Sequence, residues 1–325
     1  MSKRLGVGLP AHASGQRNRT TPAISVVIPA RNEAANLPAV ISRLPPDIFE
    51  VILVDGHSTD RTVEVARELL ADVRVFHQDG RGKGDALAIG FGAARGDIIV
   101  MLDADGSADA AEIPRFVAAL VAGADFVKGS RFAQGGGSSD ITTARRLGNR
   151  ALCALVNRVY GMLYTDLCYG YNAFWADCLP LLRTAWPGSS IGSSTSAPYG
   201  SGFEVETTLN IRAAKAGLTV WEMPSFERPR ISGQSNLNAV RDGLRILRTI
   251  WQESPGQALR RERAALAGLQ PAFDPLALVS PRESTENVVG PPALPGREYR
   301  AILPEQVVLN GNGHAPTPHA LGQAL

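Results

Sequence analysis

Short apolar runs alternate with longer, more polar segments along residues 24–102, and this alternation constrains the fold more than any other feature of the sequence. The expected strands are 24–29, 51–55, 73–77 and 97–102, and the expected helices are 33–44, 58–70 and 85–95. Strands that alternate with helices of this length form βαβ units around a parallel sheet buried on both faces. We therefore predict an α/β fold with a mostly parallel central sheet flanked by helices.

The two ends of the chain differ in composition from the part between them. Residues 1–22 carry four basic residues and no acid, and 253–325 hold 10 of the 22 prolines. We expect a disordered basic arm over 1–22, one domain over 23–252, and a Pro-rich, largely disordered tail over 253–325 with one short helix at 256–269.

Composition and charge exclude several classes of protein. Of the 325 residues, 44% are hydrophobic and 20% are charged, which excludes a wholly disordered, collagen-like or coiled-coil chain. The 33 Lys and Arg residues nearly balance the 31 Asp and Glu residues, and the body outside the basic arm is close to neutral. This argues against a nucleic-acid partner.

The cysteines and the hydropathy of the sequence indicate where in the cell the protein is expected. The three cysteines have no CxxC spacing, so we expect neither a disulfide framework nor a zinc site. No apolar run approaches the roughly 18 residues that a membrane span needs, and the N-terminus has no apolar signal-peptide region. We expect a cytoplasmic protein.

The segment 237–251 has an apolar stripe and an arginine stripe, which fits a packed helix with a solvated face or a helix on the inner face of the membrane.

Polar residues follow every expected strand, where ligands bind in open parallel sheets. Asp103 and Asp105 follow the fourth strand and point to the same face if the backbone is extended. Two adjacent carboxylates repel each other unless a cation lies between them, and oxygen ligands suit Mg²⁺ or Mn²⁺. A solvated Asp-Gly turn is the alternative.

The loop 80–84 (GRGKG) follows the third strand. Its glycines let backbone N–H groups approach an anion, and Lys83 adds a positive charge at the start of a helix. The spacing fits neither a Walker A loop nor GxGxxG, and a flexible turn is the alternative. Asp55 ends the second strand, where it could accept hydrogen bonds from a base or ribose, or cap the next helix.

The order of these motifs resembles glycosyltransferase family 2 with its GT-A nucleotide-sugar-binding fold, over about residues 24–250. In the second half, 127–132, 165–174, 202–206 and 230–237 resemble segments of dolichol-phosphate and polyprenyl-phosphate mannosyltransferases. The QxxRW motif of processive synthases is missing, which favours single transfers. Gly56, His57 and Asn236 depart from the family pattern.

The resemblance implies a role for each matching residue. Those that would bind the nucleotide sugar are Pro29, Arg31, Glu33, Asp55, Lys83 and Asp103. Mg²⁺ or Mn²⁺ would be held by Asp103, Asp105 and Ser107. The acceptor phosphate would meet Arg131, Arg146, Arg230 and Ser235. The catalytic set would be Asp105, Arg131, Glu206 and Arg230.

The implied reaction is an inverting, metal-dependent, non-processive sugar transfer from GDP-mannose or a UDP- or dTDP-hexose to a polyprenyl phosphate. A phosphate dianion needs no side-chain nucleophile, whereas a hydroxyl acceptor would need Glu206 or Asp166 as base. Alternatives are a soluble phosphorylated acceptor such as 3-phosphoglycerate and a non-catalytic nucleotide-sugar-binding subunit. The segments 133–139 and 189–202 would be lids over the site or plain surface loops.

Overall fold

The computed structural model describes residues 17–183, 202, 204–233 and 239–254, which lie within one compact unit of the chain. Ser235, Asn236, the expected tail helix and nearly all of the 189–202 segment fall outside the described residues.

A seven-stranded sheet forms the centre of this unit, in the order β3-β2-β1-β4-β7-β5-β8. All neighbouring strands are parallel except β7, which is antiparallel to both β4 and β5. A two-stranded sheet of β6 and β9 lies beside it. The strands are β1 Ile24–Ala30, β2 Glu50–Asp55, β3 Arg74–His77, β4 Ile98–Met101, β5 Phe126–Ser130, β6 Gly137–Ser138, β7 Asn172–Trp175, β8 Val220–Pro224 and β9 Phe226–Glu227.

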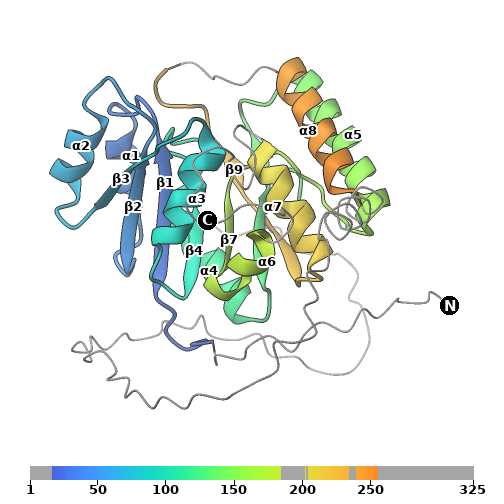
Figure 1. Cartoon of the computed structure of the whole chain (residues 1–325), viewed down its shortest axis with the longest axis horizontal. Coiled ribbons are helices and arrows are strands. Elements are labelled where there is room, and N and C mark those ends of the chain that lie inside the picture. The colour runs from blue at the N-terminus through green and yellow to red at the C-terminus, as the bar shows by residue number, and fades with distance from the viewer. Residues whose placement is uncertain (1–16, 184–201, 203, 234–238, 255–325) are drawn as a thin grey trace, which may run out of the picture. The chain divides into compact units, whose positions relative to one another are not determined.

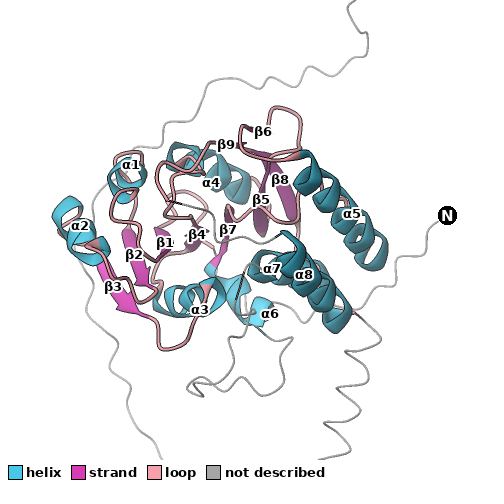
Figure 2. Ribbon diagram, turned by 90° about the horizontal axis from the view of Figure 1, so that it is seen from above, coloured by secondary structure: helices cyan, strands magenta, loops and turns pink. Residues whose placement is uncertain are grey.

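Helices cover both faces of the sheet, with α3 and α7 on one side and α4 on the other (Figure 2). The helices are α1 Leu37–Ile41, α2 Thr62–Leu69, α3 Lys83–Ala93, α4 Ile113–Val121, α5 Thr143–Tyr160, α6 Leu179–Arg183, α7 Glu204–Lys215 and α8 Ala239–Glu253. Short 3-10 turns precede α4 and α6, at Ala110–Glu112 and Ala176–Cys178. None of the helices in the described part of the chain is long and apolar enough to cross a bilayer.

The main core lies between the sheet and its helices. Successive residues of β1, from Val26 to Ile28, are fully buried, as expected for a sheet covered on both faces. Helix α3 approaches β1 closely because Gly90 has no side chain: a Cβ there would lie 2.3 Å from Val27 Cγ1. A second, smaller core forms where α5, α7 and α8 pack together, around Val156, Ile211 and Ile246.

The predicted α/β fold is confirmed, and two predicted helices begin later than expected. Residues 58–60 contact the loop after β1 rather than starting α2. Ser58 Oγ accepts a hydrogen bond from Asn32 N at 2.9 Å, and Asp60 Oδ2 accepts one from Ala34 N at 3.2 Å. The backbone of Asn32 has a positive φ of 58°, which keeps that loop out of helical conformation before α1.

The structure describes residues 17–22, the last part of the expected basic arm, and two arginines there contact the domain. Arg17 Nη1 lies 2.6 Å from Asp125 Oδ1, and Arg17 Nε lies 2.8 Å from Asp177 Oδ2. The same guanidinium lies 5.3 Å from the centre of the Trp175 ring. Arg19 Nη1 donates to the carbonyl oxygen of Val121 at 3.1 Å. These two arginines therefore attach the start of the domain to the end of α4, the residue before β5 and the 3-10 turn after β7.

Candidate active site

Lys83 lies between two carboxylates that the sequence places far from one another. Its Nζ atom is 2.5 Å from Asp103 Oδ1, at the end of β4, and 2.6 Å from Glu206 Oε1, in the first turn of α7. Burial alone would lower the pKa of Lys83, but the two neighbouring negative charges outweigh it and raise that pKa. The ammonium group is therefore fixed at the carboxyl edge of the sheet, beside Asp103, one of the three predicted metal ligands.

Glu206 is almost completely buried, with a side chain 3% exposed. Burial raises its pKa, the nearby Asp103 charge adds to that rise, and Lys83 opposes it. Its second oxygen, Oε2, is buried without a hydrogen-bond partner. A buried carboxylate oxygen with no donor is expensive unless a ligand supplies one, which fits a residue that meets a bound molecule.

Gly170 provides the space in which these three side chains meet. A Cβ atom there would lie 2.7 Å from Lys83 Nζ, 2.9 Å from Asp103 Oδ2 and 3.1 Å from Glu206 Oε1. The backbone just before β7 thus forms one wall of the cluster. Sequence reasoning missed this residue, and no sequence signal distinguishes it from the other glycines.

Arg230 forms a second group of ion pairs, next to the ion pairs of Lys83. Its Nη2 atom lies 3.0 Å from Asp105 Oδ2, and its Nη1 atom lies 3.2 Å from Glu33 Oε1. Asn36 also donates to Glu33 and, at 3.3 Å, to the carbonyl oxygen of Ser232. The segment after β9 is thereby held against the loop after β1, and Asn36 is a second residue that sequence reasoning missed.

The carboxylates of Asp103 and Asp105 each form an ion pair within the chain, Asp103 with Lys83 and Asp105 with Arg230. The side chains are 31% and 17% exposed, so both can be reached from solvent. Ser107 N donates to Asp105 Oδ1 at 2.9 Å, which fixes the direction of that carboxylate. The described residues contain no cluster of three or more His, Cys, Asp or Glu side chains that could hold a metal ion.

The remaining predicted nucleotide ligands lie at the same edge of the sheet. Asp55 pairs in register with Ala30 and His77, and His77 Nδ1 lies 3.2 Å from its carboxylate. Ser58 N also donates to Asp55, at 3.3 Å. Pro29 is partly buried at the end of β1, and Arg31, just beyond it, is exposed.

The structure does not bring Arg131 into this cluster. Its side chain is 3% exposed and contacts two buried acids: Nε lies 2.7 Å from Asp166 Oδ2, and Nη1 lies 3.0 Å from Glu227 Oε1. Asp166, which we considered as a base for a hydroxyl acceptor, is fully buried and also accepts from Arg131 Nη2 at 3.0 Å. Both residues therefore connect β5 to two other segments, and Arg131 also lines a groove between α5 and α8.

Arg146 is exposed on α5, with its guanidinium 5.8 Å from the centre of the Phe132 ring. Arg146 and Arg230 are thus the two predicted phosphate ligands with accessible guanidinium groups among the described residues. Ser235 lies outside those residues.

Comparison with known proteins places the chain in a family. The profile described as Glycosyl transferase family 2 matches residues 25–179. Over 227 residues the chain is 31% identical to glycosyltransferase AglJ of Haloferax volcanii, with 69% of each protein covered. The chain belongs to glycosyltransferase family 2. It is also 33% identical over 224 residues to the undecaprenyl-phosphate mannosyltransferase of Micrococcus luteus, covering 66% of this chain and 87% of that protein.

A third relative in family 2 is the polyprenol monophosphomannose synthase of Mycolicibacterium smegmatis, 31% identical over 231 residues, which are 68% of this chain and 83% of that protein. Among solved structures, glucosyl-3-phosphoglycerate synthase of Mycobacterium tuberculosis has a TM-score of 0.54 at 24% identity, covering 72% of this chain and 81% of that chain. Another structure of that synthase contains Mn²⁺, UDP and glucosyl-3-phosphoglycerate. The predicted GT-A fold and family are confirmed, and the chain is a nucleotide-sugar-dependent glycosyltransferase.

Proposed function

We propose that this family 2 enzyme transfers one hexose from a nucleotide diphosphate sugar to a polyprenyl phosphate, by a single displacement that inverts the anomeric carbon. The proposal rests on two ion pairs at the carboxyl edge of the sheet, Lys83–Asp103 and Arg230–Asp105. They gather two acids and two cations where β4 ends, and such a set can bind a metal–diphosphate and an incoming phosphate side by side.

The residues present fit a divalent cation. Asp103 and Asp105 offer carboxylate oxygens that solvent reaches, which are the ligands Mg²⁺ and Mn²⁺ prefer. If Asp103 and Asp105 each supply oxygen to the ion, the remaining coordination positions would go to diphosphate oxygens and water, as is usual for Mg²⁺ sites that bind nucleotides. Bound there, the ion would neutralise charge that develops on the leaving diphosphate.

The chain's own residues would supply the rest of the chemistry. Lys83 places a fixed ammonium where the diphosphate leaves, and burial makes that charge effective because little water screens it. Glu206 orients Lys83 and presents its unpaired Oε2 toward the donor. Arg230 and Arg146 would neutralise and orient the acceptor phosphate.

The transfer needs no protonated intermediate and no covalent enzyme adduct. A phosphate oxygen of the acceptor forms the new bond to the anomeric carbon while the bond from that carbon to the diphosphate oxygen breaks. The acceptor monoester is largely dianionic at neutral pH, so no side chain has to remove a proton. A general base is therefore unnecessary, in agreement with the burial of Asp166.

The choice of a lipid acceptor is supported by two relatives, one an undecaprenyl-phosphate mannosyltransferase and the other a polyprenol monophosphomannose synthase. The test offers undecaprenyl phosphate in detergent and 3-phosphoglycerate in parallel, each with labelled GDP-mannose, UDP-glucose and dTDP-glucose plus Mn²⁺. Label in the lipid fraction supports the proposal, and anomeric NMR of the product checks inversion. Label only in glucosyl-3-phosphoglycerate, or only free sugar from hydrolysis, would refute it.

A further inference from the structure

An exposed apolar surface lies on α5 and α8, two helices that run side by side at one end of the domain (Figure 1). Its members, between 38% and 63% exposed, are Leu147, Leu155 and Val159 on α5 and Leu244, Leu247 and Trp251 on α8. We refer to these six residues as the α5/α8 surface. Single exposed apolar side chains are common, but six on two neighbouring helices form a patch of the kind that contacts a partner.

Folding of the domain does not account for this surface. Other residues of the same helices already fill the second core, namely Cys153 and Val156 on α5 and Ile246 and Ile250 on α8. A helix that packs one face on a core normally exposes a polar face to water. Here each helix has a second apolar stripe that points outward.

A groove of about 480 Å³ runs between the two helices and joins their exposed faces. Its walls are mainly apolar, with Ala144, Gly148, Leu152 and Leu155 of α5 and Ile246 and Leu247 of α8, and they also include the polar residues Arg131, Arg145, Asn149 and Asp242. The methyl side chain of Ala144 and the absence of a side chain at Gly148 leave the groove open along α5. An open, apolar groove of this kind can take a hydrocarbon chain.

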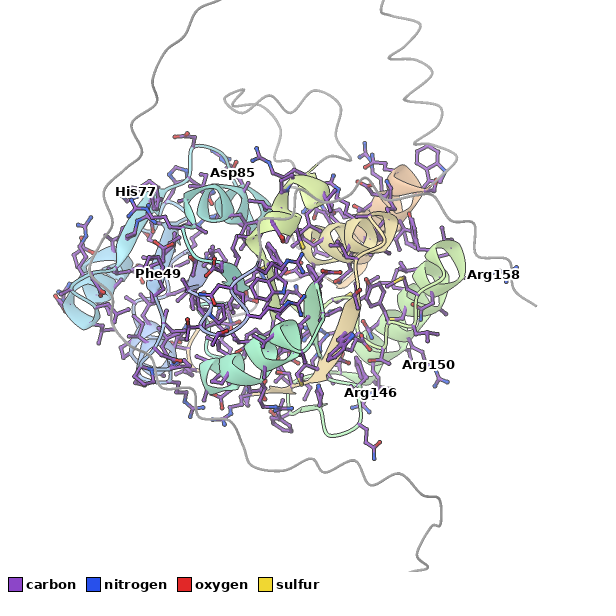
Figure 3. All side chains as sticks on the ribbon, turned by 90° about the horizontal axis from the view of Figure 1, so that it is seen from below. Phe49, His77, Asp85, Arg146, Arg150 and Arg158 are labelled. Atoms are coloured by element: carbon purple, nitrogen blue, oxygen red, sulfur yellow. The ribbon has the colours of Figure 1, made fainter. Side chains whose placement is uncertain are left out.

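The charges around the α5/α8 surface are positive. Figure 3 shows Arg146, Arg150 and Arg158 along the outer side of α5, and Arg245 and Arg248 are exposed on α8. Helix α5 contains no acidic residue. The two acids of α8, Asp242 and Glu253, are buried, at 6% and 4% exposed. Arginines beside outward leucines and a tryptophan are typical of helices that lie in the headgroup region of an anionic bilayer.

We propose that the α5/α8 surface docks the enzyme on an anionic lipid bilayer, with Leu244, Leu247 and Trp251 inserted among the headgroups and the groove open to a lipid chain. The inference rests on the proposed function in that the lipid acceptor would come from this same bilayer. The enzyme's location on the membrane would then be peripheral.

The first experiment measures sedimentation of the full chain with vesicles that contain no donor, metal or acceptor. We expect binding to phosphatidylcholine vesicles that include phosphatidylglycerol, weaker binding to phosphatidylcholine alone, and loss of binding at high salt. The double variant Leu244→Glu/Leu247→Glu should bind at least about tenfold more weakly. Arg150→Gln and Arg158→Gln should each weaken binding about fivefold.

Matched controls lie on α2, at the other end of the sheet. Leu69→Glu and Arg67→Gln change exposed residues of the same types and should bind vesicles as the unchanged chain does. Nucleotide binding by each variant verifies that it is folded.

A second readout uses tryptophan fluorescence. Trp251 is 62% exposed on α8, and Trp221 is 42% exposed on β8. Vesicles should shift the emission to shorter wavelength in the unchanged chain and in Trp221→Phe, and the shift should largely disappear in Trp251→Phe.

Three outcomes would overturn the proposal: no binding of the full chain to anionic vesicles, equal loss in the α2 controls, or a fluorescence shift that survives Trp251→Phe. A dimer in solution that Leu244→Glu/Leu247→Glu dissociates, without vesicle binding, would assign the surface to a second copy of the chain instead. Because these assays contain no acceptor, they can fail while sugar transfer to detergent-dispersed undecaprenyl phosphate succeeds. The two proposals are therefore tested separately.

Discussion

The side chains of Lys83 and Glu206 meet at 2.6 Å although the residues are 123 positions apart in the chain. If Lys83 also meets the diphosphate, Lys83→Met removes a charge-assisted contact worth about 1.5–3 kcal/mol, or roughly 10- to 150-fold in affinity. Calorimetric titration with GDP and UDP measures this loss. Arg61→Gln, which removes an exposed partner of Glu68, is the control and should leave the affinity unchanged. Unchanged affinity in Lys83→Met would contradict the assignment.

Gly170→Ala tests the wall of the same cluster without changing any charge. The added Cβ would lie 2.7 Å from Lys83 Nζ, so the ammonium must move away from Asp103 and Glu206. We expect weaker nucleotide binding and a lower melting temperature. Gly92→Ala, on α3, meets no atom within 4 Å and should slightly stabilise the fold, by about 0.4–1 kcal/mol. If both variants behave alike, the close approach at Gly170 has no role in binding.

Asp105→Asn tests the metal assignment through binding as well as turnover. The amide keeps the size of the side chain but loses the charge that attracts a divalent cation. We expect Mn²⁺ to strengthen nucleotide binding by the unchanged chain and to have little effect on the variant. Asp109→Asn, four residues further on, is the control because Asp109 contacts Arg43 and Arg228 instead. A normal Mn²⁺ effect in Asp105→Asn would exclude this residue as a ligand.

Arg131 and Arg230 should respond differently to the same substitution. Arg131→Gln leaves Asp166 and Glu227 buried without their cation, which typically costs about 3–5 kcal/mol of stability. The Arg230 side chain is 26% exposed, so Arg230→Gln should change the free energy of unfolding little and reduce use of the acceptor. Urea denaturation together with the KM for undecaprenyl phosphate separates the two cases. A stable Arg131→Gln protein with a raised KM would restore Arg131 to the acceptor site.

The raised pKa of Glu206 predicts a pH dependence of stability. Burial raises this pKa above its ordinary value of 4.5, so the folded chain keeps the proton to a higher pH than the unfolded chain does. The stabilisation from Glu206 is then fully present below pH 4.5 and is lost as the pH rises through the raised pKa. Relative to Glu206→Gln, the unchanged chain should lose stability as the pH rises toward neutrality. Urea denaturation of both proteins over this range measures the difference, and an opposite or absent trend would contradict the raised pKa.

The first half of the fold was predictable because its strands are short, β-branched and separated by helical segments. The residues that follow β1, β2 and β4 could be placed at one edge of the sheet for the same reason. The positions of Asp103 and Asp105 follow from local geometry, since residues two apart on an extended backbone share a face.

Contacts made across the chain could not be predicted in this way. The environment of Arg131 depends on Asp166 and Glu227, which come from two other segments, and its sequence motif gave no sign of its burial. The packing at Gly170 likewise depends on α3, β4 and α7 meeting at one point. The antiparallel direction of β7 was also unforeseen, because no helix-bearing βαβ pattern leads into it.

The antiparallel insertion of β7 between β4 and β5 has a practical consequence for building chimeras. Residues up to Asp105 contain most of the proposed nucleotide ligands, yet they do not form a closed half of the sheet, because the outer edge of β4 is paired by β7. A fragment ending there would expose unpaired backbone along a fully buried strand and should aggregate. An exchange of donor specificity between relatives must therefore transplant Asn172–Trp175 together with the first half, and the family profile also extends to residue 179.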